Sequence, residues 1–231
     1  MKSQSPVFDA DSKSLHALFI SEGAQAGFRI PVYQRQYDWD NSNVIRLFED
    51  VLSGLLFCVE DEDSLTFLGT IIVLTEENKE RGFDGQSLGV IDGQQRLTTI
   101  SIIACMLHQR LKSQLKRYQS SSSFSNNDEF DSWVIAEVNQ ILTLLLDFSF
   151  GYQRIGANSY PFPRVIRENE DYRGKSYQDS EYKSTIGAFL FEYSQFIAKD
   201  ESDNFSFDFK KIRKDTCLLY TSDAADEHSW V

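Results

Sequence analysis

The residue types best suited to chemistry lie in one run, Val90-Ile91-Asp92-Gly93-Gln94-Gln95-Arg96-Leu97-Thr98-Thr99. Two apolar residues end an expected strand, and Asp92-Gly93 forms a sharp turn because glycine tolerates positive φ. A helix follows, and its first turn has unpaired N–H groups and a positive dipole end that favour anions. Arg96 adds a planar charged fork suited to phosphate. The run therefore predicts a phosphate-binding turn, although many such junctions bind nothing.

A second polar stretch, residues 33–39, follows an expected short strand in which Phe28, Ile30 and Val32 alternate with other residues. Pro31 limits that strand to a sheet edge or a strand end. Aromatic residues then interleave with Gln34, Arg35 and Gln36, and such a mixture can stack on a base and hydrogen-bond its edge. In the alternative, which composition alone favours, the rings cover the core edge and Arg35 pairs with an acid.

Strands and helices on either side must position these two stretches. The apolar pattern predicts buried strands over residues 67–74 and 88–91, and a helix from Leu97 to Leu115. The long charged loop between the strands indicates a hairpin or a surface excursion. Upstream we expect a short helix capped by Asp11 or Ser12. A second helix, capped by Asn41 or Ser42, should have a wide buried face: Val44, Ile45, Leu47, Phe48, Val51, Leu52, Leu55 and Leu56.

The second half of the chain carries no chemical motif of its own. The Ser-rich break at 119–128 predicts a flexible loop or linker. Helices are expected over residues 134–146 and 184–197, and a proline-limited extended segment, a candidate edge strand, is expected over 160–167. Arg164 and Arg167 either face the first half's site or are surface charges, and the surface interpretation is favoured.

Composition limits the class of protein. The chain has 231 residues and a net charge of −12, which argues against a broad DNA-binding face because that needs Lys and Arg. It shows no signal peptide and no apolar run of membrane-spanning length, which predicts a cytoplasmic protein. Cys58 and Cys105 are expected to be buried free thiols. Neither the scattered histidines nor the acidic residues 60–63 predict a metal site.

The last residues differ in character from the rest. Residues 217–231 do not continue the preceding pattern and resemble the translation of a sequencing-library adapter. We therefore expect this tail to be non-native, and the chain to be an N-terminal fragment of a longer protein. The expected organisation is an α/β (α+β) domain over residues 10–115, a Ser-rich linker or loop over 116–130, and a mostly helical region over 131–216.

Together, the stretch Ile30–Trp39 and the run Asp92-Gly93-Gln94-Gln95-Arg96-Leu97-Thr98-Thr99 resemble the N-terminal domain of GmrSD-type restriction endonucleases. The resemblance is firm over about residues 10–115 and looser through residues 162–171. It implies a ParB/sulfiredoxin-like nucleotide-binding fold in a bacterial protein of phage defence. It also implies that cutting of modified DNA resides in a C-terminal HNH-type nuclease domain, whose active site this chain lacks.

The resemblance also assigns candidate site residues. Asp92, Gln95 and Arg96 would be catalytic, with Arg96 neutralising charge on the transferred phosphoryl group. Asp92 would orient Arg96, hold Mg²⁺ through water or position the attacking water, and these roles stay open. The remaining candidates would bind the nucleotide: Tyr33, Gln34, Arg35, Tyr37, Gly93, Gln94, Thr98 and Thr99.

The expected function is binding, and hydrolysis, of a nucleoside triphosphate with Mg²⁺ by a regulatory domain of a modification-dependent restriction protein. The alternative is a sensor that binds nucleotide or modified DNA in the same pocket without turnover and signals to a nuclease domain.

Overall fold

A small mixed sheet lies at the centre of the computed structural model, which describes residues 10–20, 27–61, 63–76, 87–121, 124–125, 128–155, 158–167, 185–198 and 205. The strand order is β2-β3-β1-β6, with β1 at Gly27–Ile30, β2 at Ile72–Glu76, β3 at Ser87–Asp92 and β6 at Val165–Arg167. β1 is parallel to both β3 and β6, whereas β2 is antiparallel to β3. The expected mixed α/β class is therefore confirmed.

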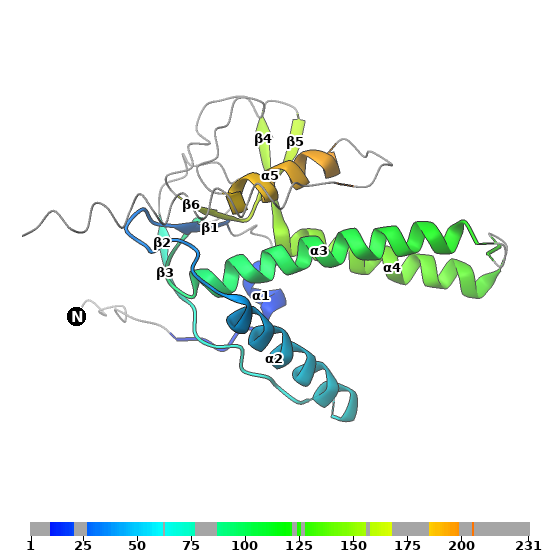
Figure 1. Ribbon diagram of the computed structural model, residues 1–231, viewed down its shortest axis with the longest axis horizontal. Helices are drawn as coiled ribbons and strands as arrows, with labels where there is room; N and C mark the ends of the chain where they lie inside the picture. The colour runs from blue at the N-terminus through cyan, green and yellow to red at the C-terminus, as the bar shows by residue number, and fades with distance from the viewer. Residues whose placement is uncertain are drawn as a thin grey trace, which may run out of the picture.

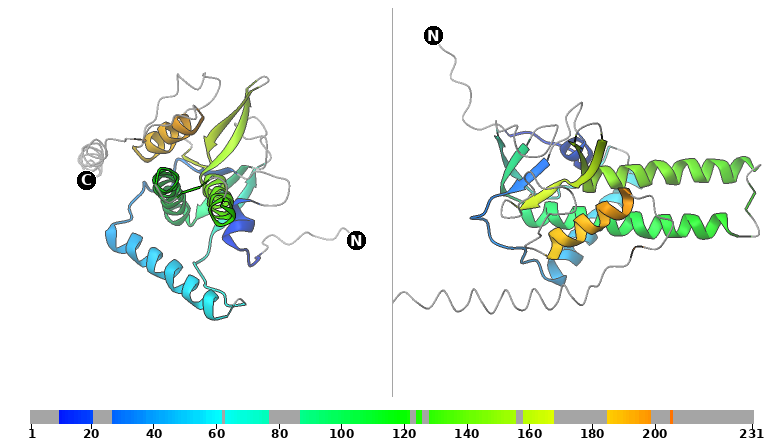
Figure 2. Two further views of the ribbon diagram at one scale, coloured as in Figure 1. Left: turned by 90° about the vertical axis from the view of Figure 1, so that its right-hand side faces the viewer. Right: turned by 90° about the horizontal axis from the view of Figure 1, so that it is seen from above.

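Helices surround the sheet and extend beyond it (Figure 1). They are α1 (Leu15–Phe19), α2 (Asn41–Glu60), α3 (Gln94–Gln119), α4 (Glu129–Ser149) and α5 (Thr185–Ala198). The long helices α3 and α4 run side by side and project away from the sheet (Figure 2). A separate hairpin, β4 (Phe150–Ile155) and β5 (Asn158–Pro163), contacts α5.

Two apolar clusters form the core among the described residues. The first joins α1, the sheet and the start of α3, and its buried members are Phe19, Phe28, Ile30, Val90, Leu97 and Val165. The second lies where α5 packs over α3 and the strand β4, and its buried members are Cys105, Phe150, Phe189, Leu190 and Tyr193. Because the first cluster contains the first turn of α3, core packing fixes where that helix begins.

Several elements agree with the sequence pattern. The β2–β3 pair is antiparallel, as a hairpin requires, and the expected second strand, helices 134–146 and 184–197 and edge strand are all present. Residues 120–128 connect α3 to the antiparallel neighbour α4. Leu107 is an exception within the stripe of α3, because 45% of its surface is exposed.

The helix caps differ from the prediction. α1 is capped by Ser14, whose Oγ accepts a hydrogen bond from the backbone N–H of Ala17. α2 is capped by Asp40, whose Oδ1 accepts one from the backbone N–H of Asn43. Hydrogen bonds lower the pKa of the Asp40 carboxyl, and the bond from the Ser42 side chain makes the largest contribution. Each cap is one of several adjacent Asp, Ser and Asn residues, so composition alone did not single out the right one.

The predicted wide buried face of α2 is wrong. Only Leu47 and Gly54 are buried along this helix. The other predicted core residues are partly or largely exposed, among them Ile45, Phe48, Leu52, Leu55 and Leu56. Figure 2 shows why: α2 stands apart from the α3–α4 pair, so only one narrow side of it meets the rest of the chain.

The predicted strand over residues 67–74 starts too early. β2 begins at Ile72, and the side chain of Phe67 is 81% exposed. Gly69 has a φ of +110°, which breaks the extended conformation before the strand. The first strand is also shorter than expected, because β1 ends at Ile30 and Val32 lies exposed beyond it. Pro31 thus marks a strand end rather than a sheet edge.

Three side chains lie in surroundings other than those expected. Cys58 is exposed, whereas Cys105 is buried as predicted, and burial raises the pKa of its thiol to about 12. Arg164 is buried rather than a surface charge, and it donates from Nη2 to the carbonyl oxygen of Phe150 (3.0 Å). Arg167 lies against the loop after β1, which is the interpretation that the sequence disfavoured.

Cys217 and the tail 217–231 lie outside the described residues, so the expectation of a non-native tail stays a prediction. The domain division at residues 115 and 131 also stays a prediction. The second half does supply a strand to the central sheet, because β6 pairs with β1. In the part of the chain that the structure describes, no helix combines the length and apolar character needed to cross a membrane.

Candidate functional site

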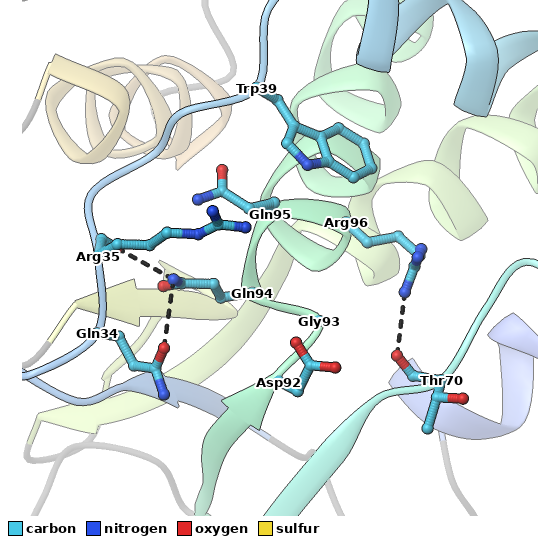
Figure 3. A pocket seen from close by; sticks show the side chains of 9 residues that line it. All are labelled: Gln34, Arg35, Trp39, Thr70, Asp92, Gly93, Gln94, Gln95 and Arg96. Atoms are coloured by element: carbon cyan, nitrogen blue, oxygen red, sulfur yellow. Dashed lines mark hydrogen bonds between the residues drawn. The ribbon is translucent and has the colours of Figure 1, made fainter.

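The candidate site lies at one edge of the sheet, where the three parallel strands end. β3 leads through Asp92 and Gly93 into α3, and β1 leads through residues 31–40 into α2. A pocket of about 370 Å³ opens between these connections (Figure 3). Ligand sites commonly form beyond the carboxyl ends of parallel strands. The pocket is lined by Gln34, Arg35, Trp39, Thr70, Asp92, Gly93, Gln94, Gln95 and Arg96.

Gly93 is required by the geometry of the turn. Its φ is +88°, the left-handed region that the sequence predicted for this glycine. A Cβ at this position would lie 2.9 Å from Cγ1 of Ile71. Gly93 is also the N-cap of α3 and provides no side-chain hydrogen bond to the helix. The first turn of α3 therefore presents backbone N–H groups without a side-chain cap beside the pocket.

Arg96 is held at the far side of the pocket by the segment before β2. Its Nη1 donates a hydrogen bond to the carbonyl oxygen of Thr70 (3.0 Å; Figure 3). The guanidinium lies directly against Gly69, where a Cβ would be 2.5 Å from Cζ of Arg96. Two glycines thus shape the site: Gly93 sets the turn, and Gly69 makes room for the Arg96 head group.

The two glutamines that precede Arg96 hold the opposite wall. Gln94 and Gln95 are both buried. Nε2 of Gln94 donates to the carbonyl oxygen of Arg35 (3.0 Å). Gln95 donates from Nε2 to the carbonyl oxygen of Gln36 (2.8 Å) and accepts at Oε1 from the backbone N–H of Asp38 (3.0 Å). These side-chain amides hydrogen-bond the backbone of the loop after β1, so their main role is to position that loop.

That loop brings Gln34, Arg35 and Trp39 to the pocket. Nε2 of Gln34 donates to the carbonyl oxygen of Ile91 (2.8 Å), which ties the loop to β3. In Figure 3 the side chain of Arg35 extends across the pocket toward Gln95, and the Trp39 ring stands between Gln95 and Arg96. The prediction that Gln34 and Arg35 reach the pocket from the side opposite Arg96 agrees with this geometry.

The other predicted nucleotide-binding residues lie outside the pocket lining. Tyr33 is 75% exposed, and Thr98 is buried within α3. The hydroxyl of Tyr37 hydrogen-bonds Oγ1 of Thr99 (2.8 Å), which also bonds the carbonyl oxygen of Gln95 (2.8 Å). Burial raises the pKa of the Tyr37 phenol, and the bond to Thr99 opposes that shift. Tyr37 and Thr99 therefore brace the loop against α3.

Sequence reasoning missed three contributors. Trp39 was left open between stacking on a base and packing at the core edge and was not among the candidate site residues, yet it lines the pocket. Thr70 and Gly69 were placed inside a buried strand, although they form the wall that holds Arg96. A glycine inside an apolar, β-branched run was the available signal, because it often marks a close approach of the backbone.

The pocket combines charges that suit a phosphorylated ligand. Arg35 and Arg96 contribute guanidinium groups from opposite walls, Asp92 contributes a carboxylate from the turn, and α3 contributes its positive end. Within the described residues, no three His, Cys, Asp or Glu side chains cluster as a metal site would need. The arrangement can bind an anion between two arginines and a helix N-terminus.

Comparison with known families identifies the family to which the chain belongs. The family model described as GmrSD restriction endonuclease, N-terminal domain, matches residues 15–227. The match covers most of the chain, so the chain belongs to this family of restriction-endonuclease N-terminal domains. The earlier resemblance to GmrSD-type N-terminal domains is thereby confirmed. No curated protein matches the chain.

Proposed function

We propose that this domain binds a nucleoside triphosphate in the pocket and hydrolyses it, as the regulatory part of a modification-dependent restriction protein. The observation that carries the proposal is that Arg35 and Arg96 line one pocket from opposite sides, beside the N-terminus of α3, which has no side-chain cap. Backbone N–H groups, a helix dipole and bidentate guanidinium groups are the means by which proteins bind phosphate. The Trp39 ring offers an apolar face for the base.

Mg²⁺ fits this pocket as the ion that accompanies the nucleotide. It is commonly held by one or two carboxylates together with substrate phosphates, and Asp92 is the carboxylate that lines the pocket. In the hydrolytic proposal Arg96 neutralises negative charge on the phosphoryl group. Asp92 holds the ion through water, orients Arg96 or positions the attacking water. The complete protein would couple this step to a C-terminal HNH-type nuclease domain that cuts modified DNA.

A sensor without turnover is the second candidate, and one contact favours it. Trp39 lines the pocket and is followed directly by Asp40, the N-cap of α2. A ligand that moves Trp39 therefore acts on the start of a helix whose apolar side is exposed. Such a sensor would bind nucleotide or modified DNA in this pocket and signal through α2 to a partner nuclease domain.

The test is release of inorganic phosphate from ATP, GTP, CTP and UTP with Mg²⁺, together with calorimetric binding of each. Arg96→Ala and Arg35→Ala should remove turnover and weaken binding, because each removes a phosphate-facing charge. Arg46→Ala is the control, since Arg46 is an exposed residue of α2 outside the pocket lining.

Turnover that both pocket variants lose would establish a hydrolase. Binding without turnover, weakened by the same variants, would support the sensor. Neither binding nor turnover by the wild-type chain would contradict the hydrolase and the nucleotide sensor, and would leave only the sensor of modified DNA.

A further inference from the structure

The end of β6 lies beside the start of the pocket loop. β6 is parallel to β1, and Arg167 is in register with Ile30, the last residue of β1. The chain turns immediately after β1, because the backbone N–H of Gln34 donates to the carbonyl oxygen of Pro31 (3.0 Å). A residue far along the sequence is therefore placed next to the backbone of Gln34 and Arg35.

The guanidinium of Arg167 binds two successive carbonyl oxygens of that loop. Nη1 donates to the carbonyl oxygen of Arg35 (3.0 Å), and Nη2 donates to that of Gln34. A planar fork suits two neighbouring acceptors, whereas the single ammonium group of lysine does not reproduce that geometry.

The same short backbone segment is held from two further elements. The carbonyl oxygen of Arg35 also accepts from Nε2 of Gln94 in α3, and the side chain of Gln34 donates to the carbonyl oxygen of Ile91 in β3. The Gln34-Arg35 peptide is thus fixed from α3, β3 and β6. Of these three supports, Arg167 is the one that comes from the second half of the chain.

We propose that Arg167 is a positioning residue of the phosphate pocket, which fixes the backbone of Gln34 and Arg35 so that the Arg35 side chain crosses the pocket toward α3. Arg167 is not among the pocket-lining residues, so it acts through Arg35 and not on the ligand. The inference rests on the proposed nucleotide site for its effect on affinity, but its effect on the loop is independent of any ligand.

Arg164 supplies a matched control three residues earlier. It is also an arginine whose guanidinium donates to a backbone carbonyl oxygen, that of Phe150. It is buried, and its Nη2 bond is made to the start of β4, whereas the Nη groups of Arg167 bond the pocket loop. Substitution there should disturb the fold locally without releasing Gln34 and Arg35.

The experiment compares Arg167→Lys, Arg167→Met and Arg164→Lys in the full chain. Amide hydrogen exchange of residues 33–39, followed by mass spectrometry without nucleotide, reports on the loop. Calorimetric binding of ATP, GTP, CTP and UTP with Mg²⁺ reports on the site, and thermal unfolding reports on stability.

Both Arg167 variants should accelerate exchange over residues 33–39 and weaken binding about tenfold, since hydrogen bonds to a charged group are lost. Arg164→Lys should lower the melting temperature more, while exchange over 33–39 and affinity stay at wild-type levels.

Each result decides between alternatives. Unchanged loop exchange in Arg167→Met would overturn the proposal, as would the same acceleration in Arg164→Lys, since the effect would then be general destabilisation. Faster loop exchange in the Arg167 variants alone, with no nucleotide bound by wild type, would support the positioning role and contradict the proposed function. Weaker binding with unchanged loop exchange would also overturn it, because Arg167 would then act on the ligand.

Discussion

At the scale of residues, the polar side chains of the run Asp92-Gly93-Gln94-Gln95-Arg96 have two roles: some hold the neighbouring loop, and others face the pocket. The glutamines are buried and bond the backbone of the loop after β1, so they build the pocket. Asp92 and Arg96 remain available at the pocket surface, opposite Arg35. The motif alone does not define the pocket, because the loop after β1 provides the second arginine and the aromatic ring.

Gly69 should be as necessary to the pocket as Arg96. Gly69→Ala puts a Cβ 2.5 Å from Cζ of Arg96 at a φ of +110°, so the guanidinium must move and the backbone is strained. We expect a loss of about 1–3 kcal/mol in the free energy of unfolding. Nucleotide affinity should fall about tenfold, as one charged hydrogen-bonding group is misplaced. Urea unfolding and calorimetric binding would measure the two effects.

Leu65→Ala is the control for this prediction, because Leu65 belongs to the same segment but is 94% exposed. It should change neither quantity. Wild-type affinity in Gly69→Ala would show that Arg96 does not need its position against Gly69.

At the scale of elements, α2 has two apolar sides that differ in solvent exposure. Val44, Leu47, Val51 and Gly54 lie on the side that is at least partly covered, whereas Ile45, Phe48, Leu52, Leu55 and Val59 form an exposed stripe. Exposed apolar residues on this scale are unusual in monomeric proteins. The helix is therefore only weakly anchored by its own chain.

Leu47 and Leu52 provide a matched pair on this helix. Leu47→Ala should lower the free energy of unfolding by about 2–5 kcal/mol, because a buried side chain is replaced by a cavity. Leu52→Ala should cost less than about 1 kcal/mol, since Leu52 is already 46% exposed. Urea unfolding of both variants would test this, and equal losses would mean that another surface covers Leu52 in solution.

α5 is attached to α3 through a buried histidine. Nδ1 of His108 and the hydroxyl of Tyr193 are 2.7 Å apart, inside the second apolar cluster. Burial, and to a lesser extent the charge of Lys112, lower the pKa of His108 to about 4. The fold thus requires the neutral imidazole.

The free energy of unfolding should consequently fall as the pH is lowered from about 6.5 toward 4. In this window the unfolded chain binds a proton at His108 that the folded chain excludes, so acid favours unfolding. The contribution is fully present above pH 6.5 and amounts to at most about 3 kcal/mol. Urea unfolding of wild type and His108→Gln across this range isolates it, since other groups titrate in both. Parallel pH profiles would contradict the assignment.

At the scale of the whole molecule, the two halves of the chain share one sheet and one site. β6 pairs with β1, and Arg167 at its end binds the pocket loop. The second core cluster joins Cys105 of α3 to residues of β4 and α5. The family match over residues 15–227 likewise spans both halves.

A fragment of residues 1–121 should therefore fail to fold cooperatively. It lacks β6, the helix α4 that packs along α3, and the residues that cover Cys105. Thermal unfolding followed by circular dichroism should show no sigmoidal transition in the fragment, in contrast to the full chain. A sharp transition would instead support the independent first domain, residues 10–115, that composition predicts.

The sequence by itself determined the local features of this protein. Gly93 was predicted at a positive φ, the helix after it and the strand before it were placed, and Arg96 and Arg35 were selected as anion-binding candidates. These follow from turn chemistry and short-range periodicity, which act over a few residues. The same local rules located α4, α5 and the edge strand at the end of the Pro-containing segment.

Only the tertiary structure decided which of these features meet. Whether α2 buries one side or two, and whether Arg167 reaches the loop after β1, depends on packing between residues distant in the chain. Periodicity shows that a helix has an apolar face but carries no information on what covers it. Trp39 lines the pocket and Tyr37 braces α3 for the same reason: the fold, and not the residue type, directs each ring.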